Sequence, residues 1–233
     1  MFFYNFCLFL LPKKKYFMRI ETKRLVYTFF FPGLFIFILW LILLLEKGLG
    51  ADWHRLGIYP RTIDGLWGIF TSPLIHSGLR HLFSNSVSFL VLGWCLFYFY
   101  QEIGFAVMPV VWISSGLITW CIGRESWHIG ASGLIYALSF FLFFSGIFRR
   151  YIPLMAVSML VVFLYGSTLW NMFPIAELVD PSISWEGHLS GAVSGLICAG
   201  IFRKYGPQKP SEPEDSDEEE GEAYWDNLEL YDK

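Results

Sequence analysis

Six long apolar runs, separated by short polar segments, dominate the pattern of this chain. They cover Leu25–Leu45, Leu82–Tyr100, Phe105–Ile122, Ala131–Phe148, Ile152–Leu169 and Trp185–Phe202. An 18-residue run forms a helix of roughly 27 Å at 1.5 Å per residue. This is close to the hydrocarbon thickness of a bilayer, about 30 Å, with some local thinning. The pattern predicts an all-α membrane protein, a compact bundle of six transmembrane helices.

The segments outside these runs suggest three parts: residues 1–24, 25–205 and 206–233. Residues 1–12 are apolar but too short to span a bilayer, and Lys13-Lys14-Lys15 follows them, whereas a secretory signal has its charge first. We expect either an interfacial segment or a true start at Met18. The aromatic-rich stretch Glu46–Arg80 is typical of a first loop lying in the membrane interface.

Charge is distributed unevenly along the chain. Residues 207–233 contain 11 acidic and 2 basic side chains, a net charge of −9, although the whole chain carries only −3. This composition predicts a disordered acidic tail. The polar loop from Asn171 to Gly187 is also expected to be mobile.

Basic residues predict the orientation in the membrane. With the N-terminus in the cytoplasm, ten Lys or Arg residues fall on the cytoplasmic side and five on the other side. We therefore expect both termini in the cytoplasm, in a bacterial-type inner membrane, with the lipid bilayer as surroundings.

Composition excludes several function classes. The chain is 55% hydrophobic, its mean hydropathy is +0.49, and it lacks a nucleotide fingerprint or a nucleic-acid signature. The four cysteines form no CxxC pair and are expected to be small buried hydrophobic residues. We expect no cofactor, no metal and no nucleic-acid partner.

Two polar residues open apolar runs where they can carry chemistry. Ser132 lies in Gly130-Ala131-Ser132-Gly133, where a helix N-terminus offers unpaired N–H groups. His188 opens the last run, at the same predicted depth near the outer face. A serine and a histidine so placed indicate a nucleophile and its base.

A third cluster lies at the outer end of the second run. His81 and Asn85 are four residues apart and share one helix face, and both can donate hydrogen bonds to a developing oxyanion. Each of these polar residues alone could instead join two helices. Their common depth with Ser132 and His188 favours a site.

Together these residues resemble the rhomboid family of intramembrane serine proteases, over about residues 25–205. Ser132 matches the family's nucleophile motif, and His188, followed by Gly191 and Gly195, matches its base. His76, His81 and Asn85 match its His-x4-His-x3-Asn pattern, and Tyr136 matches a tyrosine that packs under the catalytic histidine.

The resemblance implies a Ser132–His188 dyad that cleaves transmembrane segments, with single-span proteins as expected substrates. The oxyanion partners would be His81, Asn85 and the Ser132 backbone N–H, supported by Gly130, Gly133, His76, Tyr136, Gly191 and Gly195. Many members carry Trp-Arg in the first loop, where this chain has Trp67-Gly68. That departure concerns how the loop is anchored.

Some assignments remain open at this stage. Glu186 is expected in a loop and is not assigned as an orienting residue, and His128 is expected to be an interfacial loop residue. A catalytically inactive scaffold that binds transmembrane clients is the main alternative, and a transporter would need charged residues in mid-span.

Helix packing is expected to set the distance within the dyad. Gly191 and Gly195 share a face with His188, and Ser139 shares one with Ser132. Small residues let membrane helices approach closely, so these two faces are predicted to meet.

Overall fold

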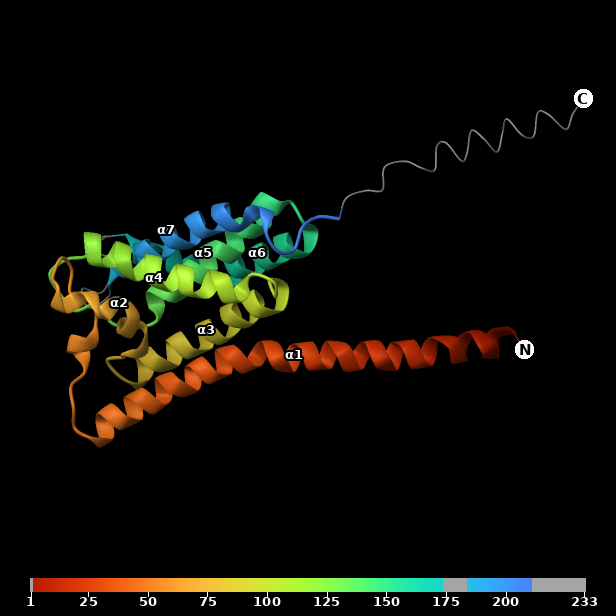
Figure 1. The fold of residues 1–233 in the computed structure, drawn as a ribbon, viewed down its shortest axis with the longest axis horizontal. Coiled ribbons are helices and arrows are strands. Elements are labelled where there is room, and N and C mark those ends of the chain that lie inside the picture. Colours follow the sequence, from red (N-terminus) through yellow and green to blue (C-terminus); the bar gives the residue numbers. More distant parts are fainter. Residues whose placement is uncertain (1, 174–183, 211–233) are drawn as a thin grey trace, which may run out of the picture.

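The computed structural model describes residues 2–173 and 184–210, with the backbone alone described for residues 2–22. The described chain is helical apart from turns and one isolated bridge, Ile58 to His128. The elements are α1 (Phe2–Gly48), η1 (His54–Leu56), η2 (Asp64–Leu66), α2 (Gly68–Thr71), η3 (Ser72–Leu74), α3 (Leu79–Phe99), α4 (Gly104–Ile122), α5 (Ser132–Arg149), α6 (Ile152–Tyr165), η4 (Gly166–Met172), α7 (Trp185–Ile201) and η5 (Phe202–Lys204), shown in Figure 1.

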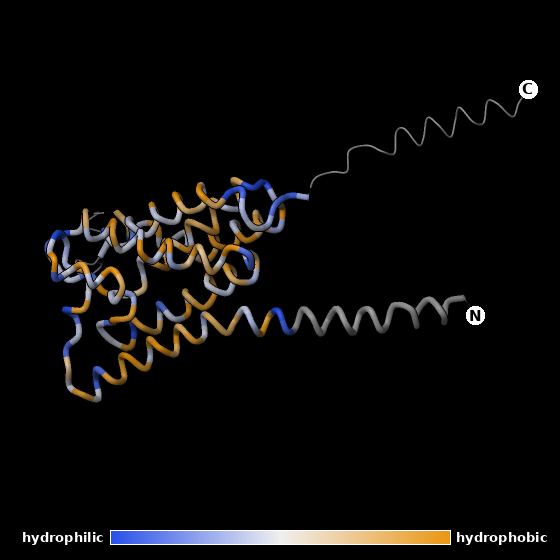
Figure 2. Tube along the Cα trace, in the orientation of Figure 1, coloured by the Kyte–Doolittle hydropathy of each residue, from blue (hydrophilic) through white to orange (hydrophobic). Residues whose placement is uncertain are grey.

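Five described helical segments are long and apolar enough to cross a membrane, which identifies an integral membrane protein. They are Lys23–Gly48, Leu79–Phe99, Gly104–Ile122, Ser132–Arg149 and Ile152–Met172. The sixth predicted run corresponds to α7, which has only 17 residues. The expected number of six spans is therefore not confirmed. Apolar positions fill the middle of the bundle and hydrophilic ones gather in the loops at its two ends (Figure 2).

Three segments differ in detail from their expected form. The predicted interfacial segment 1–24 continues without a break into the first span as one long helix, α1 (Figure 1). The first loop is folded into η1, η2, α2 and η3. The fifth run changes from α-helix to 3₁₀-helix after Tyr165, so its last residues form the separate element η4. Most of the acidic tail, and much of the predicted mobile loop, lie outside the described residues.

Helix α5 is the centre of the bundle, and its residues Leu138, Phe141 and Leu142 are fully buried. Small residues bring its neighbours close. A Cβ atom at Gly195 of α7 would lie 2.1 Å from the Ala137 carbonyl oxygen, and one at Gly191 would lie 2.0 Å from that of Gly133. The predicted close approach of these two helices is therefore present.

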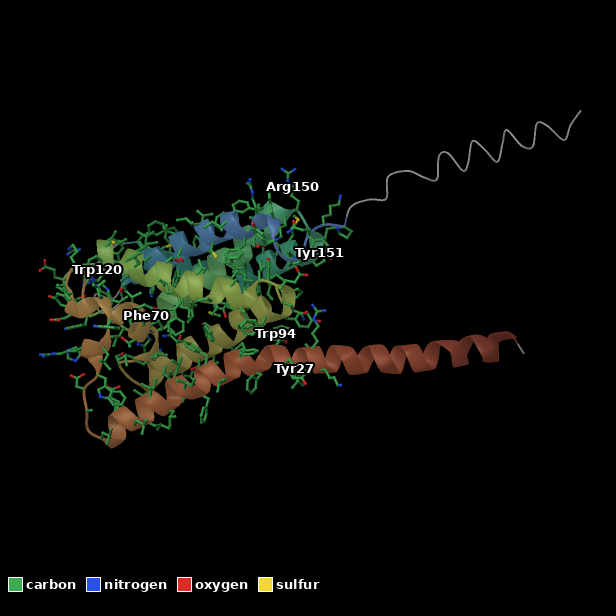
Figure 3. The ribbon with its side chains drawn as sticks, in the orientation of Figure 1. Tyr27, Phe70, Trp94, Trp120, Arg150 and Tyr151 are labelled. Carbon is green, nitrogen blue, oxygen red and sulfur yellow. The ribbon has the colours of Figure 1, made fainter. Side chains whose placement is uncertain are left out.

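The two ends of the bundle differ in charge and in aromatic side chains. Phe70 and Trp120 lie at the end where α4 finishes, whereas Arg150 and Tyr151 lie at the opposite end (Figure 3). At that second end, the buried guanidinium of Arg149 donates hydrogen bonds of 2.7 Å to the carbonyl oxygens of Phe202 and Tyr205. These bonds fasten α5 to the end of α7.

The cysteines only partly follow the sequence expectation. Cys95 and Cys198 are buried, each 1% exposed, as predicted. Cys121 is exposed near the end of α4, so the prediction was wrong for this residue. The side chain of Cys7 lies outside the described part of the chain.

Candidate active site

Ser132 is the first residue of α5, directly after Ala131 at the N-cap. The first N–H groups of a helix lack intrahelical partners and carry its partial positive charge. Gly130 makes the turn into this helix with φ of +105°, and its N–H donates to the Ser72 carbonyl oxygen at 2.9 Å. The loop therefore presents the Ser132 hydroxyl beside free backbone donors.

His188 lies in the first turn of α7 and is 7% exposed. Its ring stacks on that of Tyr136, with centroids 4.3 Å apart and planes 10° from parallel. Its Nδ1 lies 3.0 Å from the backbone carbonyl oxygen of Asn171. A carbonyl can only accept, so Nδ1 carries the proton of the neutral ring and Nε2 keeps a lone pair.

The segment η4 supports both rings of this stack. The Tyr136 hydroxyl donates to the Thr168 carbonyl oxygen at 2.5 Å, while Asn171, three residues later, accepts from His188. Sequence reasoning missed Asn171 altogether. Its contribution comes from the backbone carbonyl, which every residue has, so the identity of the side chain contains no signal.

The side chains of His81 and Asn85 lie against Gly130, two residues before Ser132. A Cβ atom at Gly130 would be 2.7 Å from His81 Nε2 and 3.5 Å from Asn85 Nδ2. His81 Nδ1 bonds the Ser77 hydroxyl at 3.2 Å, which leaves Nε2 facing the loop. Two polar nitrogen atoms thus point at the backbone that leads into Ser132.

His76 holds Asn85 from behind. Asn85 Nδ2 donates to His76 Nε2 at 3.0 Å, and the two histidine rings of this cluster are 5.0 Å apart. Burial lowers the pKa of His76 to about 4, and the nearby His81 adds to this effect. His76 is therefore neutral at neutral pH, and the second hydrogen of the Asn85 amide remains available.

A small polar cavity of about 30 Å³ adjoins Ser132. Its lining includes the polar residues Ser72, Thr119, His128 and Ser184. A water molecule needs roughly 10–15 Å³ by this measure and two or more polar partners, so one or two waters fit. In the described structure, Ser132 Oγ and the His188 ring are not hydrogen-bonded to each other, and such bonds often tighten only with substrate bound.

The structure corrects the expectation for Glu186. This residue lies in the first turn of α7 and not in a loop, and it is 2% exposed. Its carboxylate accepts from the Arg124 backbone N–H at 3.4 Å and faces the Arg124 Nε at 3.6 Å. Apolar neighbours and the Gly187 next to it hid this helical position in the sequence.

His128 lies in the loop before α5, as predicted, but it is only 4% exposed. Its Nε2 donates to the Arg124 carbonyl oxygen at 3.1 Å, and its Nδ1 lies 2.6 Å from the Ser184 hydroxyl. Burial lowers the pKa of His128. Ser184 is the N-cap of α7, a position that the preference of helix starts for serine could have revealed.

Comparison with known proteins places this arrangement among relatives. Residues 64–205 match the family model described as Rhomboid domain. The chain is 36% identical to the uncharacterized protein Rv1337 of Mycobacterium tuberculosis over 174 residues, 72% of either chain. It is 34% identical over 175 residues to the uncharacterized protein ML1171 of Mycobacterium leprae, covering 72% of this chain and 68% of that one. It is 27% identical over 145 residues to Rhomboid-related protein 1 of Caenorhabditis elegans, covering 59% and 40% respectively.

Proposed function

The chain belongs to the rhomboid family, and from that premise we propose that it is a serine endopeptidase working inside the membrane. The family acts on transmembrane substrates in the bilayer. One observation carries the proposal for this chain: His188 is stacked on Tyr136 with its Nδ1 bonded to a carbonyl oxygen. This arrangement leaves Nε2 as a base on the helix packed against the one that begins with Ser132.

Acylation begins with a proton transfer from Ser132 Oγ to His188 Nε2. Oγ attacks the carbonyl carbon of the scissile peptide bond and forms a tetrahedral intermediate. The intermediate collapses as the bond from carbon to nitrogen breaks. The imidazolium then gives its proton to the leaving amine, which releases one product and leaves the acyl group on Ser132.

The negative oxygen of the intermediate needs preorganised donors. The Ser132 backbone N–H, at the start of α5, supplies one, and the side chains of His81 and Asn85 supply the others. A donor of this kind contributes roughly 10²–10³ in rate. Gly130 belongs to the same machinery, because any larger residue would push His81 away.

Deacylation needs water beside Ser132, where membrane helices otherwise exclude it. The polar cavity next to Ser132 supplies room for that water. His188 Nε2 takes a proton from the water as its oxygen attacks the acyl carbon. The bond to Oγ then breaks and the proton returns to Ser132, which regenerates the enzyme.

We place the site near the outer face of a bacterial inner membrane, with α7 as the sixth span and both termini in the cytoplasm. The surplus of basic residues at the bundle end opposite Ser132 supports this orientation. The substrates are then transmembrane segments, in single-span proteins for instance, that are cut near their outer ends. Helix-breaking residues in such a segment let its backbone reach Ser132.

Reconstitution with a single-span substrate tests the proposal. The wild-type protein in liposomes is expected to cut a substrate with a Gly-containing outer juxtamembrane segment, and Ser132→Ala and His188→Ala are expected to leave it intact. Ser84→Ala, an exposed serine of α3, serves as the control and should cut normally. Binding of the substrate without cleavage by the folded wild type would favour the inactive scaffold.

A further inference from the structure

The start of α7 determines where the His188 side chain lies. Ser184 caps this helix: its hydroxyl accepts from the Gly187 N–H at 3.2 Å, and its carbonyl oxygen accepts from the His188 N–H at 3.2 Å. The first turn is thus built on Ser184. A shift of Ser184 would move His188 with it.

The Ser184 hydroxyl is in turn bonded to the loop that carries the nucleophile. His128 Nδ1 lies 2.6 Å from Ser184 Oγ, although the two residues are 56 positions apart in the chain. His128 precedes Ser132 by four residues. One hydrogen bond therefore links the loop leading to the nucleophile with the cap of the helix bearing the base.

The loop side of this link is rigid. His128 and Ile58 pair their backbones through hydrogen bonds of 2.9 and 2.8 Å, and the His128 ring donates through Nε2 to the Arg124 carbonyl oxygen. Because Nε2 carries the proton, Nδ1 is an acceptor, and the Ser184 hydroxyl must donate to it. The direction of every hydrogen bond in the link is therefore defined.

Charges around the link have the same arrangement. The Glu186 carboxylate, also in the first turn of α7, faces the Arg124 guanidinium at 3.6 Å. The loop thus contacts the first turn of α7 through two side-chain interactions, one neutral and one ionic. The neutral one reaches the cap itself.

We propose that His128 and Ser184 are positioning residues that set the distance between Ser132 and His188. This inference rests on the proposed function, since it concerns the same dyad. It adds two residues that touch neither the substrate nor the reacting atoms. Misplacement of about 1 Å can cost roughly 100-fold in rate, so loss of the link should be measurable.

Two substitutions of His128 separate the halves of the link. In His128→Asn, the amide oxygen lies near the former Nδ1 and can still accept from Ser184. In His128→Gln, the amide nitrogen reaches the former Nε2 and can still donate to Arg124, but nothing accepts from Ser184. Both variants are polar and uncharged, so they place no charge inside the protein.

Two substitutions of Ser184 make an independent pair. Ser184→Thr keeps the hydroxyl. Ser184→Gly removes it, yet glycine caps a helix with a loss of only a few tenths of a kcal/mol. The helix start is therefore retained in both variants, and the bond to His128 in only one.

The measurement is the rate at which a fluorophosphonate modifies the purified full-length protein, expressed per site that can finally be titrated. This normalisation removes differences in the folded fraction. We expect His128→Gln to react at least about tenfold more slowly than His128→Asn, and Ser184→Gly at least about tenfold more slowly than Ser184→Thr. Equal rates within either pair would overturn the inference. A folded wild-type protein with no reactive site would instead overturn the proposed function, and the inference with it.

Discussion

Two carbonyl oxygens determine which nitrogen carries the proton in two histidines of this protein. Asn171 accepts from Nδ1 of His188, whereas Arg124 accepts from Nε2 of His128. The two rings are therefore opposite tautomers when neutral. His188 is left with a free Nε2, which suits a base, and His128 with a free Nδ1, which accepts from a helix cap.

At the residue scale, Asn85→Ala should slow the reaction without stopping it. The variant loses one oxyanion donor, which costs roughly 10²–10³ where no other donor compensates. Because His81 and the Ser132 backbone N–H remain, we expect a loss at the low end of this range. Cleavage and fluorophosphonate modification should slow together, measured beside Ser84→Ala. Unchanged rates would show that Asn85 only joins helices.

Acid should destabilise the protein through its buried neutral histidines. The pKa of His76 is lowered from about 6.5 to about 4, so its contribution to stability is complete above pH 6.5 and is lost as the pH falls towards 4. The loss amounts to at most about 1.4 kcal/mol per pH unit for one group. Thermal unfolding in detergent between pH 7.5 and 5 measures it. His76→Gln should reduce this pH dependence, and an unaltered dependence would contradict the assignment.

Side chains with unusual polarity were predictable from the sequence, and backbone contributions were not. Ser132, His188 and Asn85 were found because polar groups in apolar runs are costly and few. The structure places them on packed elements at one end of the bundle, while their catalytic roles remain predictions. The Asn171 carbonyl was missed because the fold, and not the residue type, brings it to His188. Glu186 was misplaced because local composition concealed a helix start.

At the scale of elements, α5 is packed against a neighbour on each side through residues without large side chains. Gly195 of α7 adjoins Ala137, and Gly146 of α5 adjoins the Ser158 hydroxyl of α6. Close backbone approach allows van der Waals contact and small polar bonds to hold membrane helices together. The same contact brings the helices of Ser132 and His188 into register.

Gly195→Ala should separate α7 from α5. Its Cβ would lie 2.1 Å from a backbone oxygen, which cannot move as a flexible side chain can. We expect cleavage to fall by roughly 100-fold or more and the unfolding temperature to drop. Gly200→Ala on the same helix is the matched control, because no atom lies within 4 Å of its Cβ position. Equal activity of the two variants would show that glycine packing does not set the dyad.

Apolar runs predicted the helices well, and their ends less well. The period of hydrophobic residues shows which segments must be buried in lipid or protein, but not where α-helix gives way to 3₁₀-helix. This explains why η4 was included in the fifth run. The first loop was predicted as an interfacial segment, and its short helices have too few residues to leave a pattern.

At the scale of the whole molecule, the site and the basic residues lie at opposite ends of the bundle. Helices α3, α5 and α7 all begin at the end that contains Ser132, as Figure 1 shows. Arg149, Arg150 and Arg203 lie where α5 and α7 finish. This asymmetry was predictable from the order of charges and apolar runs, because connected helices must alternate in direction.

Cysteine accessibility tests the orientation. In a chain whose four native cysteines are replaced by alanine, Asp52→Cys should react with a membrane-impermeant thiol reagent in intact cells. Glu102→Cys, in the turn between α3 and α4, should react only after the cells are opened. Both positions are exposed, so burial does not distinguish them. The reverse pattern would place the site on the cytoplasmic side.

The central claim is that Ser132 is a nucleophile activated by His188, and its most direct test is the site of fluorophosphonate modification. The folded wild-type protein should be modified on one residue, identified by mass spectrometry as Ser132. Ser132→Ala should not be modified, and His188→Ala should react at least about 100-fold more slowly, since activation by the base is lost. Modification of folded Ser132→Ala at the wild-type rate, or of His188→Ala at that rate, would contradict the account.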